Sequence, residues 1–71
     1  MVMLSPRELE VLTWLASPHT LARIGGELFI SLSTVKNHTN HIYRKLGVAS
    51  RAEAVEHARA AGLLELSTVH E

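Results

Sequence analysis

Four polar side chains in the middle of the chain, those of Lys36, Asn37, Asn40 and Arg44, are one, three and four residues apart. In a helix this spacing places them on one face, because residues three and four apart are neighbours on a helical surface. Lysine can donate to guanine O6 and N7, and asparagine can pair with adenine N6 and N7. The face therefore has the chemistry to recognise base edges, and a merely solvated helix face is the alternative interpretation.

Signals at both ends of this segment predict a helix over about residues 32–46. Ser31 can cap its first turn with a hydroxyl oxygen, and Gly47 can end it in the left-handed conformation that glycine adopts cheaply. The opposite face is predicted to pack inward. It carries a stripe at helical spacing: Val35, His38, Ile42 and Leu46.

Composition limits the chemistry that 71 residues can perform. A chain of this length forms one small domain with a thin core, which leaves no second domain to build an enzyme cleft. It has no cysteine and no aspartate, and no glycine-rich phosphate loop or nucleophile with an acid–base partner. His38 and His41 lie one turn apart without a third ligand. We therefore expect no catalytic, cofactor or metal site.

The charge is neutral overall but unevenly distributed, with seven basic and seven acidic side chains. Residues 31–51 hold four basic side chains and no acidic one, which makes this segment a +4 patch. The flanking segments carry −1 and −3. Such a field suits a polyanionic partner better than the total charge suggests. No apolar run reaches the ~20 residues of a membrane span and no secretion signal is visible, so we expect a soluble, cytoplasmic protein.

Three further helices are predicted around this segment. Ser5, Pro6 and Glu8 form a capping box with proline at the first helical position, and the helix that follows should end at Ser17–Pro18. Its predicted inward residues are Leu9, Leu12, Leu15 and Ala16, widened by Val11 and Trp14. Thr20 should cap a shorter helix that runs to about Leu28.

Only residues 29–31 separate this second helix from the third, so the two should cross steeply as a helix-turn-helix. Gly25, in the second helix, is predicted to allow close approach of the two backbones. A second capping box at Ser50 and Glu53 should open a fourth helix that stops at Gly62, with Leu63 and Leu64 packed back. The predicted fold is all-α, a compact four-helix bundle over residues 1–64, with a frayed tail over 65–71.

The chain resembles the LuxR-type (GerE) helix-turn-helix domain of bacterial transcription regulators across roughly residues 4–64. The four fragments that carry the resemblance are Leu4-Ser5-Pro6-Arg7-Glu8-Leu9-Glu10-Val11-Leu12, Ile30-Ser31-x-x-Thr34-Val35-Lys36-x-His38, Ile42-Tyr43-Arg44-Lys45-Leu46, and Arg51-x-x-Ala54-Val55 through Gly62-Leu63. They occur in the family's order and spacing. The chain departs from the pattern over residues 18–25, where it lacks the family's frequent lysine.

The resemblance implies a DNA-binding domain whose third helix enters the major groove. It implies base contacts at Lys36, Asn37 and Asn40, and contacts with the sugar-phosphate backbone at Ser33, Thr34, Arg44 and Lys45. To the backbone contacts we add two basic residues of the same segment, His41 and Arg51.

The resemblance also implies that the fourth helix joins two copies of the domain on DNA, through Val55, Ala58 and Arg59. Val55 could equally complete the monomer core. The implied partner is double-stranded DNA, bound by a homodimer at an inverted repeat. The family usually adds an N-terminal receiver or ligand-sensing domain. Two alternatives stay open at this point: a helical protein-interaction module, and a domain like region four of a sigma factor.

Overall fold

The computed structural model describes residues 3–64, and within that range the regular structure is entirely helical. The helices are α1 (Pro6–Leu15), α2 (Leu21–Leu28), α3 (Leu32–Leu46) and α4 (Arg51–Ala60). The predicted all-α fold and its four helices are confirmed. The tail predicted over residues 65–71 lies outside the described residues. No helix in residues 3–64 is long and apolar enough to cross a membrane.

Each helix begins where the capping signals predict. The four cap hydroxyls, of Ser5, Thr20, Ser31 and Ser50, each accept a hydrogen bond from the backbone N–H three residues further on. These bonds satisfy amides that the helices leave without an internal partner. The capping box predicted at the start of α4 differs in one hydrogen bond. The Glu53 carboxylate accepts from Ala49 N at 2.9 Å instead of from Ser50 N.

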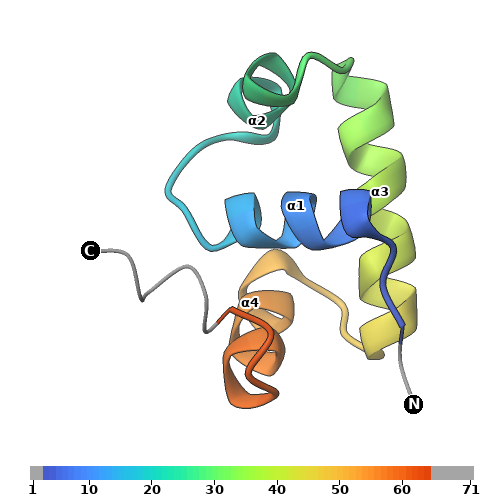
Figure 1. Ribbon diagram of the computed structural model, residues 1–71, viewed down its shortest axis with the longest axis vertical. Coiled ribbons are helices and arrows are strands. Elements are labelled where there is room, and N and C mark those ends of the chain that lie inside the picture. The colour runs from blue at the N-terminus through green and yellow to red at the C-terminus, as the bar shows by residue number, and fades with distance from the viewer. Residues whose placement is uncertain (1–2, 65–71) are drawn as a thin grey trace.

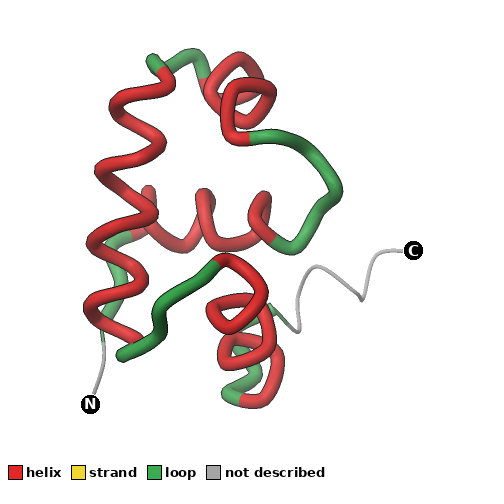
Figure 2. The backbone as a smooth tube through the Cα atoms, turned by 180° about the vertical axis from the view of Figure 1, so that it is seen from behind, coloured by secondary structure: helices red, strands yellow, loops and turns green. Residues whose placement is uncertain are grey.

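The four helices are arranged around α1, which contacts each of the others (Figure 1). α3 runs across one end of α1, and α2 and α4 lie on opposite sides of α1, as the view from behind also shows (Figure 2). α2 and α3, joined by three residues, make the predicted helix-turn-helix. One face of α3 packs against the other helices, and the opposite face is left uncovered.

The core contains apolar residues from all four helices and Leu64. Its buried members are Val11, Leu12, Leu15, Ile24, Val35, Ile42, Leu46, Ala54, Ala58 and Leu64. The predicted inward face of α1 was partly wrong. Val11, Leu12 and Leu15 are buried as predicted, but Leu9 is 37% exposed, Ala16 is exposed, and the charged Glu8 is buried instead. The buried face is therefore rotated toward Glu8, because α1 also packs against α3.

The predicted role of Gly25 is confirmed by the packing of α2 on the turn before α3. A β-carbon at Gly25 would lie 2.8 Å from the carbonyl oxygen of Ile30 and 3.3 Å from a methyl group of Val35. The adjacent Gly26 has no heavy atom within 4 Å of such a position. The chain leaves α2 through Phe29, which has a left-handed backbone (φ 59°) and is 93% exposed.

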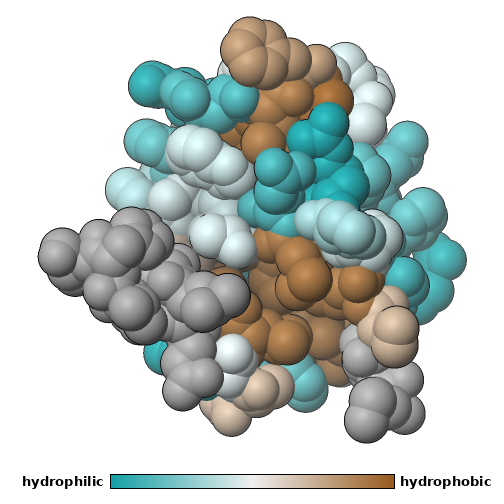
Figure 3. All heavy atoms as spheres, in the orientation of Figure 1, coloured by the Kyte–Doolittle hydropathy of each residue, from teal (hydrophilic) through white to brown (hydrophobic). Residues whose placement is uncertain are grey.

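Some apolar side chains remain on the surface of the described residues. On the face drawn in Figure 3, hydrophobic residues gather between α1 and α4. After α4, Gly62 turns the chain with φ 78°, and Leu63 N donates to Ala58 O at 2.8 Å. Leu64 packs back as predicted, but Leu63 stays 38% exposed.

Candidate nucleic-acid interface

The uncovered face of α3 holds the three residues predicted to contact bases. Lys36, Asn37 and Asn40 are all exposed. Their side chains make no hydrogen bond or ion pair with any other residue in the range 3–64. The donors and acceptors of these three side chains are therefore free to meet an external partner.

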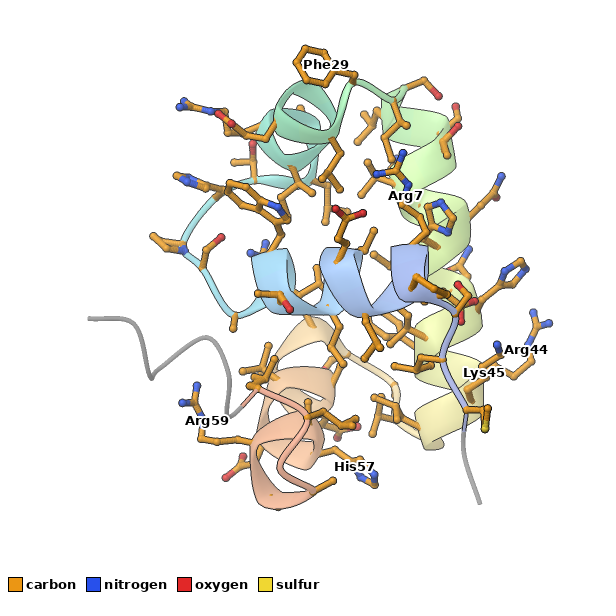
Figure 4. All side chains as sticks on the ribbon, in the orientation of Figure 1. Arg7, Phe29, Arg44, Lys45, His57 and Arg59 are labelled. Atoms are coloured by element: carbon orange, nitrogen blue, oxygen red, sulfur yellow. The ribbon has the colours of Figure 1, made fainter. Side chains whose placement is uncertain are left out.

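Three of the predicted backbone contacts flank this face. Ser33 is exposed, and Thr34 is half-buried with its hydroxyl 2.9 Å from that of Ser31. Arg44 is exposed and extends away from the body of the molecule near the C-terminal end of α3 (Figure 4). Its guanidinium group has no partner within the described part of the chain.

The buried carboxylate of Glu8 lies beside α3 and was not predicted as part of the site. Lys45 Nζ donates to Glu8 Oε1 at 2.9 Å and to Met3 O at 3.3 Å. The second carboxylate oxygen is 4.0 Å from His41 Nδ1. An acidic group from α1 thus neutralises part of the +4 segment, and Lys45 is not a free cation. One feature of the sequence could have predicted the burial of Glu8. This residue lies four and seven residues before the core residues Leu12 and Leu15, on the same face of the helix.

The environment of Glu8 favours its ionised form. The hydrogen bond from Lys45, and then the one from the backbone N–H of Ser5, lower the pKa of Glu8 below its ordinary value, against the effect of burial. Charge-assisted bonds of this kind are stronger than neutral ones. Glu8 therefore ties the C-terminal half of α3 to the first turn of α1.

Arg51, predicted to contact the DNA backbone, makes two hydrogen bonds within the domain. Its guanidinium group donates to Leu15 O at 3.0 Å and to Ser17 O at 2.7 Å. These carbonyls lie at and just beyond the C-terminal end of α1, where the helix dipole attracts a cation. Arg51 is thus engaged in holding α4 to α1. Burial raises the pKa of Tyr43, and the positive charge of Arg51 partly opposes this rise.

The three residues predicted for contact between two copies differ in accessibility. Ala58 is fully buried in the monomer core, so its side chain has no surface to offer a partner. Val55 is half-buried, and Arg59 is exposed. Figure 4 shows Arg59 and Arg44 projecting from opposite sides of the molecule. An open hollow of about 560 Å³ on the α4 side is lined by Leu15, Arg51, Ala52, Val55, Glu56 and Arg59.

The sequence predicts that His38 and His41 of α3 lack a third ligand for a metal ion. Residues 3–64 contain no group of three or more histidine or acidic side chains that could hold a metal ion. His38 was predicted to pack inward. It is half-buried without a hydrogen-bonded partner in the described range, and the neighbouring Thr39 is buried instead. Thr39 is satisfied locally, because its hydroxyl donates to Lys36 O at 2.8 Å.

Comparison with known proteins decides among the open interpretations of this helix-turn-helix. The family model described as "Bacterial regulatory proteins, luxR family" (GerE) matches residues 2–58. The chain belongs to the LuxR family. It is thus a helix-turn-helix DNA-binding domain of a transcription regulator.

Two kinds of relative agree with this LuxR-family assignment. A stretch of 62 residues is 45% identical to the "Probable transcriptional regulatory protein NarL" in two strains of Mycobacterium tuberculosis, covering 87% of this chain and 29% of that protein. The fold matches the crystal structure of the response regulator ChrA of a heme-sensing two-component system. The TM-score is 0.84 and the identity 43%, over 89% of this chain and 31% of ChrA. The chain thus spans less than a third of the length of these relatives.

Proposed function

We propose that this LuxR-family domain reads DNA sequence by inserting α3 into the major groove. The observation that carries the proposal is the set of free, exposed side chains at Lys36, Asn37 and Asn40 on one face of α3. The major groove admits a helix and displays a distinct donor and acceptor pattern for each base pair. Lysine and asparagine are suited to guanine and adenine, respectively, in that pattern.

Contacts with phosphates would fix the position of α3 in the groove. Ser33, Thr34, His41 and Arg44 border the base-reading face, and of these Arg44 supplies the free positive charge. Lys45 would contribute more weakly, because its ammonium group is shared with Glu8. Arg51 is left out of the proposed contacts, since both its bonds stay within the domain. Backbone contacts of this kind position a protein without carrying sequence information.

The domain would bind an inverted repeat as a homodimer, formed through α4 on DNA. In a two-fold dimer the same surface of both copies meets itself, so that surface must carry groups complementary to one another. Glu56 and Arg59 have opposite charges and line one hollow beside Val55. In a two-fold pair, Glu56 of one copy can meet Arg59 of the other. A dimer of this kind places its two reading helices on half-sites of opposite orientation.

In the full-length regulator we place this domain after an N-terminal receiver or ligand-sensing domain. The support is the likeness to a response regulator that is more than three times as long as the matched region. The regulator would act in the bacterial cytoplasm, at the nucleoid, because its ligand is the chromosome. As a binding domain of a regulatory family it would have no enzymatic activity of its own.

The first test is selection of binding sites from randomised duplex DNA, followed by titration of the best site at two salt concentrations. We expect an enriched inverted repeat and an affinity that falls steeply with salt, because binding releases counterions from phosphates. Absence of enrichment together with salt-insensitive binding would contradict the proposal.

Two variants on α3 separate reading from positioning. Asn40→Ala should weaken binding to the selected site by about 1–3 kcal/mol and relax the base preference at one base pair. Arg44→Ala should weaken binding to all DNA sequences alike. It should also reduce the slope of log affinity against log salt concentration by about 1 per copy of the domain. If both variants lost affinity equally on every sequence, α3 would not be reading bases.

A charge exchange tests the dimer. Arg59→Glu should abolish cooperative binding to two half-sites while leaving binding to one half-site intact, and addition of Glu56→Arg should restore it. Unchanged cooperativity in Arg59→Glu would place the dimer contact elsewhere.

A further inference from the structure

An exposed leucine interrupts the polar face of α3. Leu32 is the first residue of this helix, it is 42% exposed, and it is absent from the apolar residues that pack against the core. It lies four residues before Lys36 and eight before Asn40. Residues at this spacing follow one another along the helix surface. Leu32 therefore continues the base-reading stripe by one turn toward the N-terminus of α3.

Leu32 can recognise only an apolar group in a DNA groove, because its side chain has no hydrogen-bond donor or acceptor. The major-groove edge of a base pair offers one such group, the C5-methyl of thymine. In helix-turn-helix proteins the N-terminal residues of the recognition helix approach the base edges. Leu32 occupies that position, and its polar neighbours Ser31 and Ser33 cannot supply an equivalent apolar contact.

We propose that Leu32 selects a thymine by packing on its methyl group, next to the base pair that Lys36 contacts. The proposal rests on the proposed insertion of α3 into the major groove and adds a specificity residue to it. Removing one methyl group from such a contact should lower affinity about three- to fivefold, the factor that corresponds to one buried methylene-sized group.

Phe29 provides a matched control for a general effect of apolar surface. It is also exposed and lies three residues before Leu32, but it belongs to the turn that ends α2. Figure 4 shows its ring at the α2–α3 turn, projecting away from the body of the molecule. Phe29→Ala retains a β-carbon at the same backbone position, so it removes the ring without changing the type of backbone strain.

The experiment replaces each thymine of the selected half-site by uracil, one at a time. Uracil retains the pairing edge and O4 and lacks only the methyl group. Binding of wild type, Leu32→Ala and Phe29→Ala is titrated on each duplex, and circular dichroism checks that each variant is folded. We expect wild type and Phe29→Ala to lose three- to fivefold at one thymine position. Leu32→Ala should lose less than about 1.5-fold there.

The ratio of affinities within each variant makes the result independent of any overall weakening. Equal sensitivity to uracil in wild type and Leu32→Ala would overturn the role of Leu32, as would a half-site in which no thymine substitution matters. If wild type bound no duplex with sequence preference, the proposed function itself would fail, and that outcome is visible before any uracil is introduced.

Discussion

Replacement of Gly25 by alanine tests how α2 is held against α3. The added β-carbon would lie 2.8 Å from Ile30 O, which belongs to the backbone, and 3.3 Å from Val35 Cγ2, which is in the core. Neither atom can swing away as the end of a long side chain would. The turn is also held by a hydrogen bond from Ile30 N to Gly25 O of 2.9 Å. Relief of the clash must therefore move the start of α3.

Two opposing terms set the magnitude. Overpacking of a buried position costs about 1–3 kcal/mol. Alanine in a helix interior regains about 1 kcal/mol relative to glycine. Because the first obstacle is a backbone atom, we expect the upper part of the overpacking range and a net loss of about 1–2 kcal/mol. In a domain of this size that loss lowers Tm by roughly 5–15 °C.

The adjacent glycine, Gly26, provides an internal control in which the same substitution should raise stability instead of lowering it. Gly26 is exposed, and a β-carbon added to it would have no heavy atom within 4 Å. Gly26→Ala should therefore raise stability by about 0.5–1 kcal/mol through helix propensity alone. Urea and thermal unfolding followed by circular dichroism measure both variants. If Gly25→Ala proved as stable as Gly26→Ala, the close approach of α2 to the turn would not constrain this position.

Three further predictions concern contacts outside the reading face. Glu8→Gln should lower the free energy of unfolding by about 1–2 kcal/mol at neutral pH, because it removes a charge-assisted hydrogen bond to Lys45. Because the fold lowers the pKa of Glu8, its contribution is complete above the unfolded pKa of about 4.3 and is lost as the pH falls through the lower folded value. Urea unfolding of both proteins across this acidic range should therefore converge, and a constant gap would refute the ion pair. Arg51→Gln should lower stability by about 1–3 kcal/mol by removing bonds to two carbonyls, and leave the salt slope of DNA binding unchanged. A slope reduced by about 1 would instead indicate a phosphate contact. Phe29→Gly should raise Tm, because glycine relieves a left-handed backbone that costs other residues about 1–2 kcal/mol; a lower Tm would show that the exposed ring contributes to folding.

Local signals in the sequence were sufficient to predict the helices and the exposed polar face of α3. A capping hydroxyl acts on an amide three residues away, and helical periodicity is a property of one segment. Both can therefore be recognised without knowing the neighbours of that segment. This is why the starts at Ser5, Thr20, Ser31 and Ser50 and the exposure of Lys36, Asn37 and Asn40 were predicted correctly. The need for glycine at position 25 also followed, because only three residues link α2 to α3.

Only the tertiary structure decided which charged side chains are free. Glu8 and Lys45 are 37 residues apart in sequence, and Arg51 is 36 residues from Leu15, yet both pairs are bonded. Counting charges along the chain cannot find such pairs, because they depend on how α1 packs against α3 and α4. The same packing buries Ala58 and turns the core face of α1 toward Glu8. The sequence by itself thus determined the helices and the chemistry of α3, while the packing of the helices determined which part of that basic segment can face DNA.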